Sequence, residues 1–175
     1  YSGYLDRRRN HLYVQNLSTG QVRQLTSGDY DDSQPAWSPD GRLIAFVSNR
    51  TAEPDANDNR DIWVVSADNP DAGGTLLQVT TNPGAAWSPD GQTLAYVTVT
   101  EPEIIWYATS HLAIAPASGG NARVLTSRLD RNVSAPRFTP DGEEIHFVLE
   151  DSGERHLAAI GVSGENYRRL TEGPL

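Results

Sequence analysis

The sequence predicts an all-β fold, built as about three and a half four-stranded antiparallel blades of a β-propeller. Three observations predict it: a turn motif that recurs, two further landmarks that follow it in constant order, and short apolar segments without sustained helical periodicity. The first residue of the motif is Trp37, then Trp87, then Phe138, so the units are 50 and 51 residues long. These three aromatic side chains are expected to be core residues that pack between adjacent sheets. A four-stranded unit of about 50 residues has the size of one propeller blade.

The turn motif predicts a tight hairpin between the first and second strands of each unit. It reads Trp-Ser-Pro-Asp-Gly at 37–41 and 87–91, and Phe-Thr-Pro-Asp-Gly at 138–142. Its Pro restricts φ, its Asp tolerates the bridge region and its Gly can adopt a positive φ. The segment after each motif, such as 43–47, is apolar, β-branched and aromatic, as expected of a strand buried on both faces.

Two more landmarks predict the third and fourth strands. The third strand begins at a His or Asp, in the segments 11–14, 61–64, 111–114 and 156–159. The fourth strand precedes a Leu-Thr or Val-Thr pair, found at 25–26, 79–80, 125–126 and 170–171. The landmarks divide the partial propeller of residues 1–175 into a half blade at 1–28 and complete blades at 33–82, 83–128 and 133–173.

This number of blades is too small for a closed ring of the usual kind, which has four to eight. Apolar faces at the two ends of the stack would then need a neighbour. We therefore expect self-association of the chain. The sequence also contains no Met and begins at Tyr1, which suggests a piece of a longer protein.

Composition restricts the partners. The 175 residues carry a formal charge of −9, which argues against nucleic acid, since phosphate binding depends on clustered cations. The cluster at 7–9 is interpreted as a solvated loop. No segment is long and apolar enough to span a membrane. Without Cys or a visible signal peptide, the compartment stays open between cytoplasm and periplasm.

No catalytic, metal or cofactor site is predicted. The segment 161–165, Gly-Val-Ser-Gly-Glu, lacks the spacing of a nucleophile elbow and lies where a turn is expected. His11, His111 and His156 begin third strands, so their repetition favours a structural role, and His146 lies within a second strand. The acidic loop 53–61 raises a calcium hypothesis, but it lacks the Gly and terminal Glu of a calcium loop, so a solvated loop is favoured.

Several segments resemble the propeller of prolyl-oligopeptidase-type serine peptidases, with the acylaminoacyl-peptidase or dipeptidyl-aminopeptidase-like branch as the best fit. They are Asp-Tyr-Asp-Asp at 29–32 running into the first turn motif, the strands 44–50 and 61–65, Leu-Asp-Arg-Asn-Val at 129–133, and Glu-Asp-Ser-Gly at 150–153. The resemblance implies a hydrolase domain elsewhere in the parent chain, which the propeller would gate or support, and short peptides as the parent's substrate.

The longer loops are expected on one face of the propeller, at 27–34, 49–60, 99–110 and 127–134. Irregular backbone displays side chains that strands cannot, so this loop face is the predicted binding or interdomain surface. Its candidate residues are Tyr30, Asp31, Asp32, Arg60, Trp106, Tyr107, Asp130 and Arg131. The alternative is that pairs such as Asp130 and Arg131 brace their own loops.

Two other functions compete with a peptidase propeller. One is a TolB-like propeller that serves as a protein-binding module. The other is a propeller enzyme acting on sugars, which would need a convergent His or metal cluster. A region downstream with G-x-S-x-G, Asp and His in that order would favour the peptidase.

Overall fold

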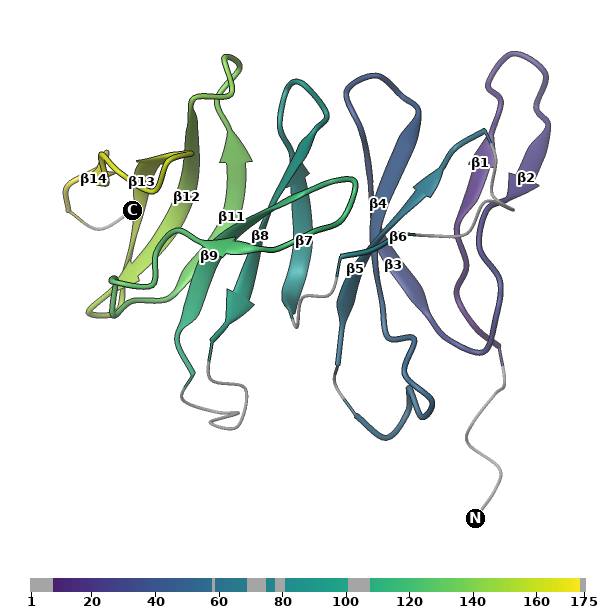
Figure 1. Cartoon of the computed structure of the whole chain (residues 1–175), viewed down its shortest axis with the longest axis horizontal. Helices are drawn as coiled ribbons and strands as arrows, with labels where there is room; N and C mark the ends of the chain where they lie inside the picture. The colour runs from purple at the N-terminus through teal and green to yellow at the C-terminus, as the bar shows by residue number, and fades with distance from the viewer. Residues whose placement is uncertain (1–7, 58, 69–74, 78–80, 101–107, 174–175) are drawn as a thin grey trace.

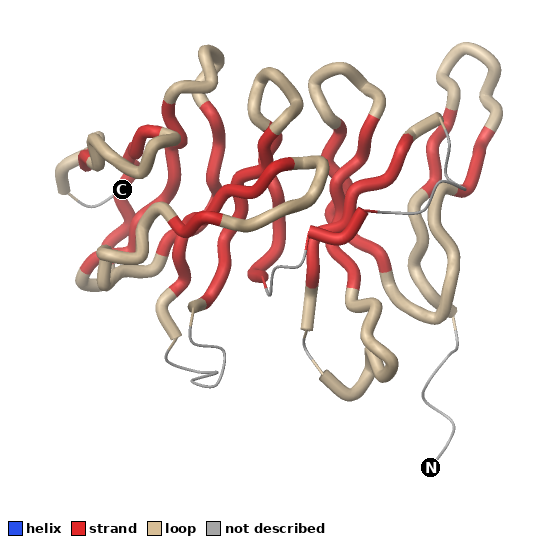
Figure 2. The backbone as a smooth tube through the Cα atoms, in the orientation of Figure 1, coloured by secondary structure: helices blue, strands red, loops and turns tan. Residues whose placement is uncertain are grey.

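A computed structural model of the chain describes residues 8–57, 59–68, 75–77, 81–100 and 108–173. These residues form fourteen β-strands and no helix (Figure 2), so none of them belongs to a helix that could cross a membrane. The predicted all-β fold of antiparallel propeller blades is confirmed.

The strands form four antiparallel sheets that follow one another along the molecule in chain order (Figure 1). The first sheet has two strands, β1 (Tyr13–Gln15) and β2 (Val22–Gln24). The second contains β3 (Asp32–Trp37), β4 (Leu43–Ser48), β5 (Asp61–Ser66) and β6 (Thr75–Leu77). The third contains β7 (Thr81–Trp87), β8 (Thr93–Val99), β9 (Ser110–Pro116) and β10 (Arg123–Val124). The fourth contains β11 (Val133–Phe138), β12 (Glu144–Asp151), β13 (Glu154–Gly161) and β14 (Arg168–Arg169).

Strands pair in sequence order within every sheet, which is the up-and-down arrangement of a propeller blade. The first strands of neighbouring four-stranded sheets contact one another: β3 contacts β7, and β7 contacts β11. These strands therefore line the inner side of the stack, and the short fourth strands form its outer side.

The turn motif is held by a hydroxyl and a carboxylate. The Ser38 hydroxyl donates to Asp40 Oδ1 at 2.6 Å, and the Arg42 amide donates to the same oxygen at 3.1 Å. These two bonds, the Ser38 bond first, lower the pKa of Asp40. Gly41 adopts φ 72° and donates its amide to the Ser38 carbonyl, which closes the hairpin.

The third copy of the motif keeps this chemistry although its letters differ. The Thr139 hydroxyl donates to Asp141 Oδ1 at 2.5 Å, just as Ser88 donates to Asp90 at 2.5 Å. The Phe-Thr version therefore preserves the hairpin, because the bond needs a hydroxyl and not a particular side chain.

The Leu-Thr landmark ties the fourth strand to the third. Thr126 Oγ1 accepts a bond from the Leu112 amide at 2.8 Å, while the Leu125 amide donates to the Leu112 carbonyl at 2.8 Å. The pairs Leu12–Thr26 and Leu157–Thr171 repeat the hydroxyl bond at 2.9 Å. The Thr hydroxyl thus continues the ladder beyond the end of the short fourth strand.

Apolar side chains fill the three spaces between successive sheets. Phe46, Tyr96 and Phe147 occupy equivalent places in the second strands and are each almost completely buried. Each belongs to a separate core cluster between its own sheet and the preceding one. Burial also raises the pKa of Tyr96 to about 12.

The turn-motif aromatics differ from the sequence-based expectation that all three are core residues. Trp87 packs against the cluster between the second and third sheets, and its indole N–H donates to the Ala36 carbonyl at 2.9 Å. Phe138 is likewise partly buried between the third and fourth sheets. Trp37, in contrast, is 50% exposed, so the prediction was wrong there. Among the described residues, the sheet before it consists of β1 and β2, so the Trp37 indole has there no inner strand of the kind that Trp87 packs against.

This difference provides a matched pair of variants. We expect Trp87→Ala to lower the free energy of unfolding by about 3 kcal/mol, because it leaves a cavity between two sheets and removes an inter-sheet bond. Trp37→Ala should cost less than about 1 kcal/mol, since half of that side chain already faces solvent. Urea titrations followed by circular dichroism measure both. Equal losses in the two variants would contradict the packing role given to Trp87.

Candidate functional site: the loop face

The two ends of the sheets differ in character (Figure 1). The turn motifs and the β1–β2 turn lie together at one end, where the connections are short. The opposite end carries the long connection between β4 and β5, the segment that links the first sheet to the second and the segment that links the third to the fourth. We call this opposite end the loop face.

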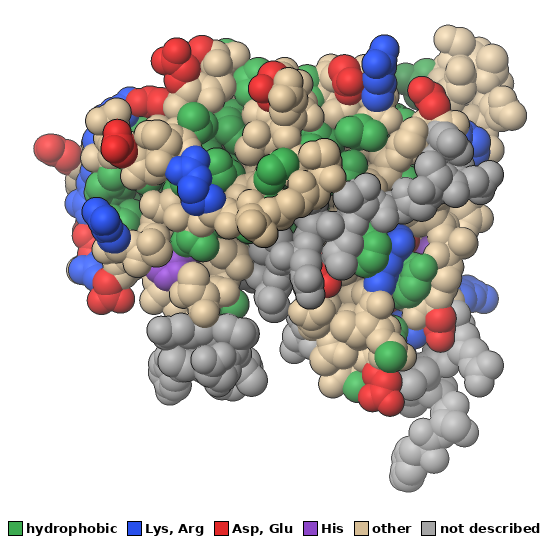
Figure 3. Space-filling model, in the orientation of Figure 1, with side chains coloured by type: hydrophobic (Ala, Val, Ile, Leu, Met, Phe, Trp, Pro, Cys, Tyr) green, Lys and Arg blue, Asp and Glu red, His purple; other side chains and the backbone are tan. Residues whose placement is uncertain are grey.

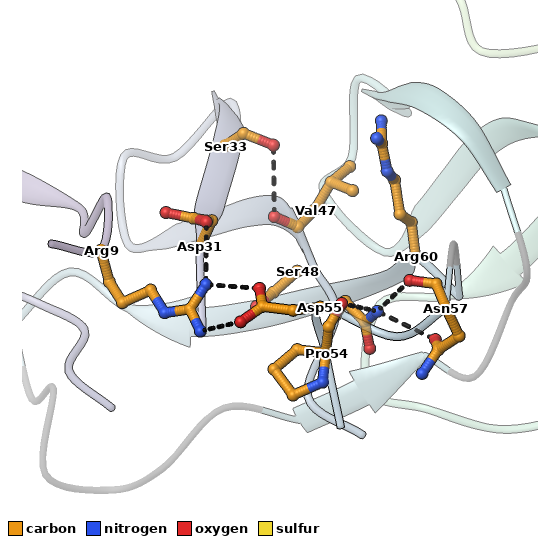
Figure 4. A pocket seen from close by; sticks show the side chains of 10 residues that line it. Arg9, Asp31, Ser33, Val47, Ser48, Pro54, Asp55, Asn57 and Arg60 are labelled. Atoms are coloured by element: carbon orange, nitrogen blue, oxygen red, sulfur yellow. Dashed lines mark hydrogen bonds and ion pairs between the residues drawn. The ribbon is translucent and has the colours of Figure 1, made fainter. Parts of the chain in front are cut away.

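A pocket of about 250 Å³ opens on the loop face, between the first and second sheets (Figure 4). It contains two of the predicted site residues, Asp31 and Arg60. Side chains from three separate segments surround it: Arg9, Asp31, Ser33, Val47, Ser48, Asn49, Pro54, Asp55, Asn57 and Arg60. The lining is polar and carries charges of both signs.

Arg9 is the central cation of this pocket. Its guanidinium donates two bonds of 2.7 Å to the Asp55 carboxylate, and it bonds Asp29 at 2.9 Å and Asp31 at 3.5 Å. The bonds from Asp55 and Asp29 raise the pKa of Arg9, and the Arg9 bond lowers the pKa of Asp55. The interpretation of 7–9 as a solvated loop was therefore wrong for Arg9, which anchors the β4–β5 loop to the chain before β1.

Two asparagines shape the β4–β5 loop. The Asn49 amide donates to the carbonyls of Pro54 and Asn57 at 3.0 Å each. The Asn57 amide donates in turn to the Glu53 carbonyl and to the Thr51 hydroxyl. The side chains thus satisfy the backbone of this loop from within, and Asp55 faces Arg9. In the described residues no three His, Asp or Glu side chains are grouped as metal ligands.

Arg50 forms a second cluster at the base of the loop. Its guanidinium lies 4.5 Å from the ring centroids of Tyr30 and Trp63, and 5.2 Å from that of Phe46. It also donates to the fully buried Asp32 carboxylate at 3.2 Å. Cation–π contacts of this kind strengthen when the cation is desolvated. Tyr30 and Asp32, two of the predicted site residues, therefore hold Arg50 in place.

Asp130 and Arg131 lie in the connection between β10 and β11, beside the fourth sheet and apart from the pocket. Arg131 donates to Asp151 at 2.7 Å, and Arg169 donates to the other oxygen of Asp151 at 2.5 Å. These bonds, with one from Ser152, lower the pKa of Asp151 to about 2. Figure 3 shows acidic and basic side chains gathered around this end of the fourth sheet. Arg131 thus ties the β10–β11 connection to its own sheet, which is the bracing alternative.

The predicted residues therefore fall into three groups. Asp31 and Arg60 line the pocket, Tyr30 and Asp32 surround Arg50, and Asp130 and Arg131 belong to the Asp151 cluster. Trp106 and Tyr107 lie outside the described residues. The sequence reasoning missed Arg9, Arg50 and Asp55. A signal for Arg50 was available, because an Arg two residues after a buried strand needs a partner.

The segment 161–165 forms a turn, as expected. The Gly164 amide donates to the Gly161 carbonyl, and the Gly161 amide donates to the Glu165 carbonyl, both at 2.8 Å. His111 Nδ1 is 3.0 Å from the Thr126 carbonyl, and His156 is buried beneath Glu154. The Ser163 hydroxyl accepts a bond from the Glu165 amide at 3.3 Å, within the same turn.

We expect Arg50→Ala to lower the free energy of unfolding by about 3 kcal/mol, because it removes the guanidinium from the buried Asp32 carboxylate and leaves His11, at 3.4 Å, as its other side-chain partner. Arg155→Ala is the matched control, since Arg155 is exposed and forms a single surface pair with Glu150. Thermal unfolding of both variants measures the difference. A loss no greater than that of the control would show that the Arg50 cluster is not a stabilising element.

The Asp151 cluster predicts a dependence on acid pH. Because the folded-state pKa is about 2 and the ordinary value is 3.8, its bonds stabilise the fold above pH 3.8. This contribution is lost as the pH falls from about 4 towards 2. The difference in stability between the wild type and Asp151→Asn should therefore shrink over that range. A difference that stays constant with pH would contradict this assignment.

Comparison with known proteins agrees with the propeller architecture. A stretch of 54 residues is 33% identical to the uncharacterized peptidase YuxL of Bacillus subtilis (strain 168), covering 31% of this chain and 8% of that protein. The match thus spans a small part of the length of that curated relative.

Three solved structures are similar over most of the chain. TolB from Acinetobacter baumannii has a TM-score of 0.67 at 19% identity, covering 93% of this chain and 37% of that one. The acylaminoacyl peptidase of Pyrococcus horikoshii has a TM-score of 0.66 at 16% identity, with 92% and 24% covered. An oligogalacturonate lyase from Vibrio parahaemolyticus has a TM-score of 0.71 at 18% identity, with 94% and 47% covered. At these identities the likeness shows a shared fold alone.

A family model adds a sequence-based assignment. The model of the TolB beta propeller domain matches residues 5–132, which is more than half of the chain. Together with the repeated turn motif and the four successive sheets, this match shows that the chain belongs to the TolB β-propeller domain family.

Proposed function

We propose that this chain is the non-catalytic propeller of a serine peptidase that acts on short peptides, and that it gates or supports the hydrolase domain of that enzyme. The observation that carries the proposal is the sequence similarity to YuxL, a protein named as a peptidase. The segments at 29–32 and 129–133, which resemble peptidase propellers, support it. The fold is shared with an acylaminoacyl peptidase and is compatible with this function.

The loop face is the part of the chain suited to this role. Its pocket offers the carboxylates of Asp31 and Asp55 and the guanidinium of Arg9, which can bond the charged and amide groups of a peptide or of a neighbouring domain. Peptide bond cleavage would be performed by a nucleophile outside this chain, since the segment 161–165 forms a turn and lacks the spacing of a nucleophile elbow. The propeller's contribution is then to restrict or orient what reaches that nucleophile.

A TolB-like protein-binding module is the second candidate. The family match and the likeness to TolB from Acinetobacter baumannii favour it. In that function the same loop face would contact a protein partner, and no hydrolase domain would be joined to the chain.

The two candidates separate when the complete gene product is obtained and treated with a fluorophosphonate probe, which labels activated serines. A peptidase is expected to label at a Ser outside residues 1–175, within a G-x-S-x-G sequence. Absence of such a sequence from the gene would reject the peptidase and favour the binding module. Peptide hydrolysis by residues 1–175 alone would reject a non-catalytic role.

Gating has its own test in the complete peptidase. We expect Asp55→Asn to change kcat/KM for a peptide relative to that for a small ester, because the Arg9 anchor of the β4–β5 loop is weakened. Glu165→Gln is the matched control, an acidic side chain at the opposite end of the sheets. If both variants keep the wild-type ratio for the two substrates, the loop face does not select substrates.

A further inference from the structure

Every turn motif contains an Asp-Gly bond, a pair of residues that is open to spontaneous chemical change. The sequence has three such bonds, at 40–41, 90–91 and 141–142, and none outside the motifs. In an Asp-Gly pair the Gly amide nitrogen can attack the side-chain carboxyl of the Asp, because Gly has no side chain to hinder the approach. These bonds are therefore candidate modification sites, at the end of the sheets opposite the loop face.

The modification converts aspartate into isoaspartate in two steps. In the first, a bond forms between the amide nitrogen and the carbon of the protonated side-chain carboxyl, the C–OH bond breaks, and the hydroxyl leaves with the amide proton as water. In the second, water opens the resulting succinimide ring at the former backbone carbonyl. The main chain then runs through the side-chain carbon and is longer by one carbon. The first step needs a carboxyl that is free to turn towards the nitrogen and to accept a proton.

The hairpin of the third sheet restrains its carboxyl. Asp90 Oδ1 accepts bonds from the Ser88 hydroxyl at 2.5 Å and from the Gln92 amide at 3.0 Å. The buried Ser88 hydroxyl accepts in turn from the Thr93 amide at 2.9 Å, which leaves its own proton for the carboxylate. These bonds to Asp90, the one from Ser88 first, lower the pKa of Asp90, so the carboxylate resists the protonation that the first step needs.

The attacking nitrogen is restrained as well. The Gly91 amide donates to the Ser88 carbonyl at 2.9 Å, and Gly91 adopts φ 70°. The amide therefore has to leave this bond before its nitrogen can attack the carboxyl. Both reacting groups of the Asp-Gly pair are thus engaged in the bonds that close the hairpin.

The other two motifs hold their Asp-Gly pairs with the same bonds. The distance from the hydroxyl to the carboxylate is 2.6 Å in the second sheet, and it is 2.5 Å in the fourth, where Thr139 replaces Ser. The distance from the Gly amide to the carbonyl is 2.9 Å in all three hairpins. The hydroxyl is therefore present even where the first two residues of the motif differ.

We propose that the three turn motifs are latent sites of isoaspartate formation, and that the hydroxyl of each motif protects its own Asp-Gly bond while the hairpin stays closed. Modification then requires local opening of a hairpin, which releases the carboxylate and the amide together. The modified hairpin cannot close in the same way, because its main chain is longer and Gly91 already lies against the second sheet, where Pro39 Cδ is 3.7 Å from the position of a Cβ. This proposal is independent of the function proposed above.

Site-resolved measurement of isoaspartate in the folded chain tests the proposal. After prolonged incubation near neutral pH, chromatography of proteolytic peptides separates the aspartyl and isoaspartyl forms, which have the same mass. We expect Ser88→Ala to raise the rate of modification at 90–91 about tenfold, because the carboxylate loses a charge-assisted bond. The bonds at 40–41 and 141–142 of the same molecules are internal controls and should keep their wild-type rates. Ser88→Thr should behave as the wild type, since Thr139 forms the same bond in the fourth sheet.

A second variant separates this protection from the stability of the sheet in general. Trp87→Ala weakens the packing of the third sheet but keeps the hydroxyl that bonds Asp90, so it should raise the rate at 90–91 less than Ser88→Ala does. The wild-type chain should also be modified more slowly than a short peptide of residues 85–94. An equal rise in the two variants, a rise at all three bonds in Ser88→Ala, no rise at all, or equal rates for chain and peptide would overturn the proposal.

Discussion

The fold depends on one constraint: the second strands β4 and β8 are apolar on both of their faces, so each of their two sheets needs a neighbour on each side. In β4, Ala45 packs towards the third sheet while Phe46 packs towards the first. Burial of this kind is the dominant favourable contribution to folding, and it has no direction of its own. The relative orientation of two neighbouring sheets is fixed by polar bonds between them, such as the bond from Trp87 to Ala36 and the bonds from Arg123 to the fourth sheet. Stacking and its specificity therefore have separate physical sources.

The two ends of the sheets are also stabilised by different interactions. At the turn-motif end, each hairpin is closed by its own hydroxyl–carboxylate pair, so the connections are short and self-sufficient. At the loop face the backbone is longer and is stabilised by side chains from other segments. Arg9 connects the chain before β1 with the β4–β5 loop, and Arg50 is held among rings from three different elements. The loop face is thus a shaped surface with charges in defined places, as a binding or interdomain role requires.

Much of the fold could be predicted because its chemistry is local. The hairpin needs a hydroxyl, a Pro, an Asp and a Gly within five residues, and the Leu-Thr pair bonds a strand only fourteen residues earlier. Because these short motifs recur along the chain, they predict the strands and their order without any knowledge of contacts between the sheets. The site was predicted only in part for the opposite reason. Asp31 and Arg60 were placed on the loop face by loop length, but Arg9 and Asp55 meet across 46 residues of sequence, and no local pattern indicates such a pair.

The sequence by itself determined that this protein is a series of four-stranded antiparallel sheets, because each sheet's hairpin and strand alternation is encoded within its own repeat. Only the tertiary structure decided which side chains are buried. Trp37 and Trp87 occupy identical motifs, yet one is half exposed and the other packs between sheets. The physical reason is that burial depends on the neighbouring sheet, and in the part of the chain that the structure describes the neighbour of Trp37 consists of the two strands β1 and β2.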